Sequence, residues 1–117
     1  NAALQEEGFA CLMSIARSGK IKIKIAEEGG IGSVLWAMKV NREHAGVQNE
    51  GCVLLGCLAD NNATNRATIA SEGGIQVVLG AMQLHLSHAG TQQDACGALA
   101  SMTVDVQFKV KAAGEGA

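Results

Sequence analysis

Proline and tyrosine are absent from this chain of 117 residues, and its aromatic residues are two phenylalanines and one tryptophan. A β-sandwich draws heavily on tyrosine, phenylalanine and valine, so the shortage of aromatic residues disfavours that class. Hydrophobic residues still make up 48% of the chain, which is enough to fill a core. Small apolar side chains must therefore do the packing, and this favours closely spaced helices.

The chain also lacks a strong excess of charge, with 9 lysines and arginines against 11 acidic residues and a net charge of −2. No overall field favours nucleic acid or an anionic membrane. No apolar run approaches the roughly 20 residues that a membrane-spanning helix needs. We expect no secretory leader, and the start at Asn1 is consistent with an excised fragment. Nucleic acid and membrane are therefore not expected as partners.

Motifs for catalysis and cofactor binding are missing as well. The sequence contains no G-x-S-x-G, no Walker motif and no histidine with a carboxylate at metal-ligand spacing. Gly30-Ile31-Gly32 begins like a dinucleotide fingerprint, but Leu35 stands at the position of its third glycine. His44 and His88 are expected in loops about 8–10 Å apart, too far to share one metal ion. We expect a noncatalytic protein with no cofactor and no metal.

The four cysteines show neither C-x-x-C spacing nor zinc-finger pairing with histidine; they are Cys11, Cys52, Cys57 and Cys96. We interpret them as free buried thiols of a reducing, cytoplasmic compartment. A redox or metal role is the alternative. Asn62-Ala63-Thr64 matches a glycosylation sequon, which we attribute to chance and to a helix cap at Asn62.

The chain does contain an internal repeat, in which two short stretches of sequence recur. Residues 26–31 (AEEGGI) return as residues 70–75 (ASEGGI), and residues 44–46 (HAG) return as residues 88–90. Both recurrences are 44 residues apart (70 − 26 and 88 − 44). A fixed period of this size predicts a solenoid, in which each unit buries its apolar face against its neighbours.

Two kinds of amphipathic helix are predicted in each unit. The stretch after each glycine pair has apolar residues at i, i+3, i+4 and i+7: Ile31, Val34, Leu35 and Met38, then Ile75, Val78, Leu79 and Met82. A second stripe at i, i+4, i+8 and i+11 occurs three times: Leu4, Gly8, Leu12 and Ile15; Val47, Gly51, Leu55 and Leu58; Thr91, Ala95, Leu99 and Met102. Its second position is always small, which predicts that another helix passes close by.

A third, shorter segment precedes each glycine pair, at residues 20–28 and 63–72. Residues 20–25 (KIKIKI) alternate with period two and alone favour a strand, whereas residues 64–69 (TNRATI) do not alternate. The repeat favours a helix in both places, ended by glycine. An exposed edge strand at residues 20–25 is the alternative.

Three helices in about 44 residues, with a glycine pair before the second, resemble the armadillo repeat. Residues 65–75 (NRATIASEGGI) match its first helix and turn, and residues 47–59 (VQNEGCVLLGCLA) match its third helix. Two features depart from the family. Gly32 and Gln76 stand where proline often follows Gly-Gly-Ile, and the connections at about 39–46 and 83–90 are roomy.

The resemblance implies an all-α, right-handed α-α superhelix formed by a single solenoid segment over residues 1–117. Residues 1–18 would be the third helix of a partial repeat, 19–61 and 62–104 would be full repeats, and 105–117 would start another.

Armadillo arrays generally bind proteins or peptides along a concave surface lined by third helices. Helical spacing from the matched residues places nine residues there: Glu7, Ala10, Ser14, Glu50, Val53, Cys57, Asp94, Gly97 and Ser101. Family members that grip extended basic peptides typically carry tryptophan and asparagine in the second and third of these rows. Because this chain does not, a nuclear-import type of peptide binding is not expected. We expect a noncatalytic protein-interaction module.

The first row is acidic and consists of Glu7, Glu50 and Asp94. It would suit a partner bearing lysine or arginine; alternatively, the acids merely complement the N-terminal halves of their helices. Trp36 is expected to be packed or half-buried, with an exposed contact residue as the alternative.

Two other functions remain open. The chain could serve as a structural element that stacks end to end with further repeats or with another copy, or it could assist a catalytic domain located elsewhere.

Overall fold

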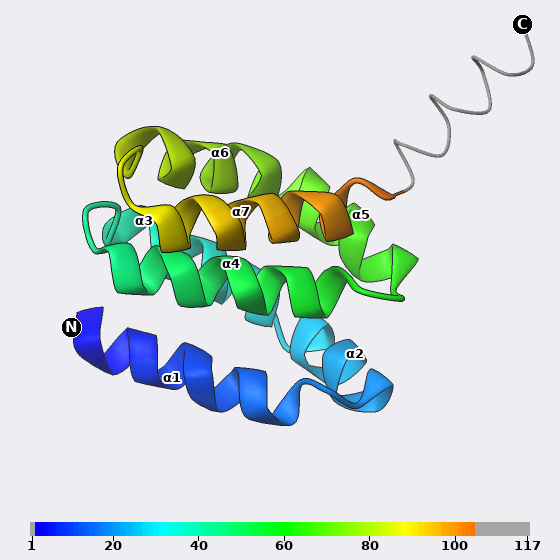
Figure 1. The fold of residues 1–117 in the computed structure, drawn as a ribbon. Helices are drawn as coiled ribbons and strands as arrows, with labels where there is room; N and C mark the ends of the chain where they lie inside the picture. The colour runs from blue at the N-terminus through cyan, green and yellow to red at the C-terminus, as the bar shows by residue number, and fades with distance from the viewer. Residues whose placement is uncertain (1, 105–117) are drawn as a thin grey trace, which may run out of the picture.

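The computed structural model describes residues 2–104, which form seven α-helices and no β-strand (Figure 1). The helices are α1 (Ala2–Ile15), α2 (Gly19–Glu27), α3 (Gly30–Val40), α4 (Ala45–Ala59), α5 (Ala63–Ser71), α6 (Gly74–Leu84) and α7 (Ala89–Met102). The predicted all-α class is therefore confirmed for this part of the chain. The repeat expected to start at residue 105 lies outside the described residues.

The longest helices form one layer. α4 lies between α1 and α7 and packs against both (Figure 1). Behind this layer, α3 packs on α4, α6 packs on α7, and α3 and α6 contact each other. The helix lengths of 9, 11 and 15 residues in α2, α3 and α4 return as 9, 11 and 14 residues in α5, α6 and α7.

Residues 20–25, for which the local pattern favoured a strand, belong to helix α2. Residues two apart on a helix point in nearly opposite directions, while residues four apart share a face. Ile21 and Ile25 are accordingly half-buried, whereas Ile23 is 48% exposed. The helix prediction is therefore confirmed and the edge-strand alternative is wrong. Of the alternating isoleucines, Ile21 and Ile25 form one apolar face of the helix, and Ile23 lies on the opposite side.

The glycine pairs serve two different purposes. Gly29 and Gly73 adopt left-handed φ angles of 80° and 85°, which only glycine adopts without strain. Gly30 and Gly74 have no room for a side chain: an added Cβ would lie 2.7 Å from the Ile25 carbonyl oxygen and 2.9 Å from that of Ile69. The first glycine of each pair allows the turn, and the second lets consecutive helices approach closely.

The predicted apolar stripes of α3 and α4 form the centre of the core. All their members are buried: Ile31, Val34, Leu35, Met38, Val47, Gly51, Leu55 and Leu58. A Cβ at Gly51 would lie 2.6 Å from Met38 Sδ. The expectation that a helix passes close to this small residue is confirmed, and the helix is α3.

The equivalent stripes on the outer helices are only partly covered. Leu4 is 69% exposed and Leu79 is 43% exposed, and a Cβ at Gly8 would meet nothing within 4 Å. The sequence predicted burial at all three positions. Within the described residues, α1 has no helix packed on it in the way that α3 packs on α4, and no helix lies beyond α6.

The connections before α4 and α7 are shorter than expected. They comprise residues 41–44 and 85–88 rather than 39–46 and 83–90, since each long helix begins immediately after a histidine cap. The Nδ1 atoms of His44 and His88 accept bonds of 3.2 Å from the backbone N–H groups of Val47 and Thr91. Asn62 caps α5 in the same way, accepting a 2.9 Å bond from the N–H of Asn65, as predicted.

Two glycines of α6 provide a test of the close approach at the glycine pair. Gly80→Ala meets open space and is expected to raise the free energy of unfolding by up to about 1 kcal/mol, the helix-propensity difference. Gly74→Ala must displace Ile69 and is expected to lower the free energy of unfolding by about 1–3 kcal/mol. Urea unfolding followed by circular dichroism measures both. Equal effects of the two substitutions would contradict the packing described here.

Candidate protein-binding surface

The nine predicted contact residues all reach solvent on the layer formed by α1, α4 and α7. Glu7, Ala10, Ser14 and Gly97 are exposed. The other five are half-buried: Glu50, Val53, Cys57, Asp94 and Ser101. We call this layer the long-helix face. It matches the predicted placement of these residues off the buried stripes.

Five of the nine residues come together in a hollow of about 560 Å³ between α4 and α7. They are Val53, Cys57, Asp94, Gly97 and Ser101. The two helices approach closely at Gly56 and Ala98, which also line the hollow, since a Cβ at Gly56 would lie 3.4 Å from the Ala98 Cα atom. Glu50 and the three residues on α1 lie outside the hollow.

Charge is unevenly distributed among the helices. α1, α4 and α7 contain the acidic residues Glu6, Glu7, Glu50 and Asp94 and no lysine or arginine. The shorter α2 alone carries Lys20, Lys22 and Lys24. Among the described residues, the carboxylates of Glu7, Glu50 and Asp94 form no ion pair. The long-helix face is therefore acidic and uncompensated, although the net charge of the chain is near zero.

The helix macrodipole does not account for the acidic row. Glu7, Glu50 and Asp94 are each the sixth residue of their helix, and the first turns of α1, α4 and α7 contain no acidic residue. The dipole effect falls off within the first turn, where the N–H groups point outward. This position weakens the alternative interpretation that the acids complement the helix N-termini.

Some polar groups of the face are already engaged within the chain. The Cys57 thiol donates to the Ala16 carbonyl oxygen at 3.3 Å and so joins α4 to the end of α1. The Ser14 hydroxyl donates to the Ala10 carbonyl oxygen at 3.1 Å within α1. The hydrogen atoms of these two side chains are therefore already used within the chain.

The cysteines are free, as expected, but not all are buried. Cys52 is buried and Cys57 is half-buried, whereas Cys11 and Cys96 are exposed. Cys52 and Cys96 occupy equivalent positions 44 residues apart, and they differ because α7 covers α4 while no described helix lies beyond α7. Burial, and to a smaller extent the Asp94 carboxylate, raises the pKa of the Cys52 thiol to about 12.

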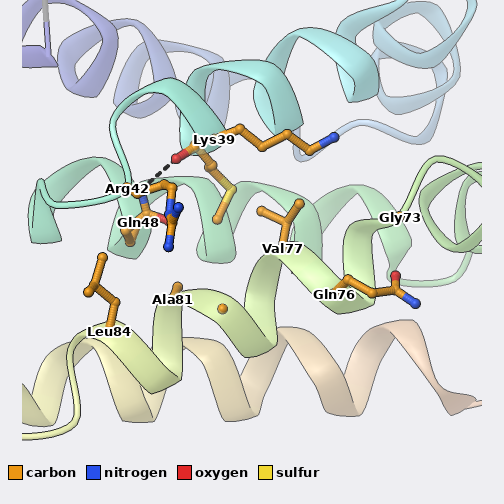
Figure 2. A pocket seen from close by; sticks show the side chains of 10 residues that line it. Lys39, Arg42, Gln48, Gly73, Gln76, Val77, Ala81 and Leu84 are labelled. Carbon is orange, nitrogen blue, oxygen red and sulfur yellow. Dashed lines mark hydrogen bonds between the residues drawn. The ribbon is translucent and has the colours of Figure 1, made fainter.

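Trp36 is 60% exposed, so the expectation of a packed or half-buried side chain is wrong. The exposure agrees with the alternative of an exposed contact residue, and the contact itself stays a prediction. Trp36 lines an apolar hollow of about 900 Å³ between α1 and α3, which the sequence did not indicate. A third hollow, of about 380 Å³, lies between α3 and α6 with Lys39 and Arg42 on its α3 side (Figure 2).

Two classes of site find no support in residues 2–104. No group of three or more histidine, cysteine, aspartate or glutamate side chains is arranged to hold a metal ion. No helix in this range is both long and apolar enough to cross a membrane.

The raised pKa and burial of Cys52 predict selective thiol chemistry. At pH 8, iodoacetamide is expected to modify Cys11 and Cys96 readily and to leave Cys52 unmodified until the protein unfolds, because the reactive thiolate is scarce and enclosed. Mass spectrometry of proteolytic peptides with and without urea measures this, and the exposed thiols of the same molecule are the control. Fast labelling of Cys52 in the folded protein would contradict the described core.

Comparison of the chain with protein-family models, with curated proteins and with solved structures found no match.

Proposed function

We propose that this chain is an armadillo-like segment of a right-handed α-solenoid, a noncatalytic module that binds a protein or peptide partner along the long-helix face. The units would be residues 19–61 and 62–104, preceded by a partial repeat at 1–18. Support for the repeat comes from the helix order and from the resemblance in sequence, and polar contacts add to it.

Two glutamines make the same pair of bonds in the two units. Gln48 Nε2 donates to the carbonyl oxygens of Met38 at 3.0 Å and Asn41 at 2.9 Å. Gln92 Nε2 donates to those of Met82 at 3.0 Å and His85 at 3.0 Å. Each glutamine thus holds the C-terminal end of the helix before its own. Equivalent contacts 44 residues apart are expected of stacked copies of one structural unit.

The charge distribution supports a basic partner, and it is the single observation on which the proposal rests most heavily. Three unpaired carboxylates lie on three neighbouring long helices, and those helices carry no lysine or arginine. Adjacent packed helices are about 8–10 Å apart, so neighbouring carboxylates of the acidic row are separated by about that distance. The lysine or arginine side chains of one extended segment could contact all three carboxylates. The α4–α7 hollow would accept an apolar side chain between them.

A structural role in end-to-end assembly is the second candidate. Large apolar side chains are exposed at both ends of the helix stack: Leu4 and Trp36 at one end, and Leu79, Leu84 and Leu86 at the other. Monomers at high concentration in sedimentation experiments would count against this role.

Charge reversal tests the proposed basic partner. The probe is a fluorescein-labelled extended peptide of about twelve residues that alternates lysine and serine, titrated with the protein at low salt and followed by anisotropy. Combined Glu7→Lys, Glu50→Lys and Asp94→Lys substitutions are expected to weaken binding about tenfold or more, since each removes an attraction of about 1 kcal/mol in water and introduces a repulsion. The affinity of this variant for the peptide should also depend less on salt concentration than that of the unaltered protein.

A matched variant distinguishes the effect of the acidic row on peptide binding from the effect of overall net charge. Glu27, Glu43 and Glu72 are exposed and lie outside α1, α4 and α7, and reversing all three changes the net charge by the same amount. This control is expected to bind the peptide nearly as well as the unaltered protein. Equal loss in both variants, or no binding by the unaltered protein, would refute the proposal.

A further inference from the structure

The hollow of about 380 Å³ between α3 and α6 lies apart from the long-helix face, since none of the nine predicted contact residues lines it (Figure 2). α3 and α6 form its walls, and Gln48 of α4 contributes to its lining. The connections that precede α4 and α6 contribute Arg42 and Gly73. The volume of the hollow lies within the range of about 300–1,000 Å³ that is typical of small-molecule sites.

Small residues of α6 keep this hollow open. A Cβ at Gly80 would meet nothing within 4 Å, and the next residue is the buried Ala81. Met38 and Val77 complete an apolar inner surface, to which the exposed Leu84 adds its side chain. The hollow therefore offers contact to the apolar body of a ligand.

Two cationic side chains line the same hollow. Figure 2 shows Lys39 and Arg42 extending from the α3 side in different directions. Both are exposed, and neither side chain forms an ion pair or a hydrogen bond among the described residues. No acidic residue lines the hollow, and α6, which forms the opposite wall, contains no charged residue.

Two acidic residues of the surrounding segments leave this positive charge uncompensated. Glu43 lines a neighbouring hollow together with Lys39 and Arg42, yet it lies within ion-pair distance of neither. The Glu72 carboxylate lies near the other end of α3, 3.8 Å from a Cβ placed at Gly32. An anion in the α3–α6 hollow is thus attracted by two positive charges that have no counter-charge in its lining.

The polar groups of the lining suit a ligand whose polar atoms lie at one end. Apart from the two cations, the polar side chains are Gln48 and Gln76. Both N–H groups of Gln48 are already bonded to the carbonyl oxygens of Met38 and Asn41. An extended peptide would bury backbone N–H and C=O groups along the whole hollow. The one amide left without a described partner, that of Gln76, cannot pair them all. This favours a small molecule over a segment of a partner protein.

We propose that the α3–α6 hollow binds a small monocarboxylate with an apolar body, such as a medium-chain aliphatic acid. The Arg42 guanidinium pairs with both carboxylate oxygens, a geometry that its planar fork matches. The flexible Lys39 side chain supplies a second positive charge, and the apolar body lies over Met38, Val77 and Ala81. This site and the acidic row of the long-helix face take ligands of opposite charge.

The test titrates ¹⁵N-labelled protein with octanoate and follows the backbone amide signals by NMR. We expect saturable shifts of Val77, Gly80 and Ala81, with a dissociation constant on the order of 1 mM or lower. The Trp36 indole signal of the same spectrum reports on the α1–α3 hollow and should stay unchanged. Octanamide, which keeps the apolar body and lacks the charge, should bind at least tenfold more weakly.

Charge variants test the two cations separately. Arg42→Gln is expected to weaken octanoate binding about tenfold and Lys39→Gln about threefold, because Arg42 makes the paired contact. A matched variant with Arg17→Gln and Lys20→Gln removes two positive charges from exposed positions outside the hollow. This control should bind octanoate as well as the unaltered protein does.

Shape variants test the open space. Gly80→Leu places a side chain in the hollow and is expected to weaken octanoate binding at least tenfold, while its higher helix propensity preserves α6. Gly8→Leu also meets open space, but this position lines the α1–α3 hollow, so it should leave octanoate binding unchanged. Circular dichroism checks that both variants are folded.

Three results would overturn the proposal: no saturable shifts of Val77, Gly80 and Ala81, equal binding of octanamide, or equal octanoate binding by the Gly80→Leu variant. Tighter binding of an acetylated tripeptide that ends in a free leucine carboxylate would assign the hollow to a protein C-terminus and would also overturn it. Reversal of the acidic row leaves the lining of this hollow unaltered, so octanoate binding should persist in that variant. This proposal and the basic-partner proposal therefore fail independently.

Discussion

The close approach of α3 to α4 is the contact on which the rest of the structure depends. Gly51 leaves the space that Met38 fills, and Gln48, one turn earlier on α4, bonds the carbonyl oxygen of the same methionine. One residue is thus fixed through its side chain and its backbone, which sets the distance and register between the two helices. Because α4 also packs against α1 and α7, the layer of long helices takes its position from this contact.

This packing also determines where functional groups are available. α4 and α7 use their small and aliphatic residues to meet α3 and α6. The other side of these helices faces solvent, and Glu50 and Asp94 lie there. The lysines of α2 lie on a different part of the molecule. An acidic face and an apolar hollow at one end are therefore consequences of the same arrangement, with different chemistry at each place.

The sequence predicted the helices and the glycine turns, and it placed the nine predicted contact residues off the buried stripes, because a 3.6-residue period fixes which side of each helix faces a neighbour. It did not predict which neighbours are present. Leu4, Leu79 and Cys96, which were predicted to be buried, and Trp36, which was predicted to be packed or half-buried, are all exposed. The connection lengths were also wrong, since histidine is an uncommon helix cap and His44 and His88 gave no local signal of a helix start.

These disagreements share a physical cause that makes them useful. In the proposed repeat, Leu4, Leu79 and Cys96 would be buried against a neighbouring unit, so their exposure marks the ends of the helix stack within the described residues. Gly8 differs from these residues because it matches Gly51, a position that Met38 fills, whereas an apolar side chain is adapted only to burial in general.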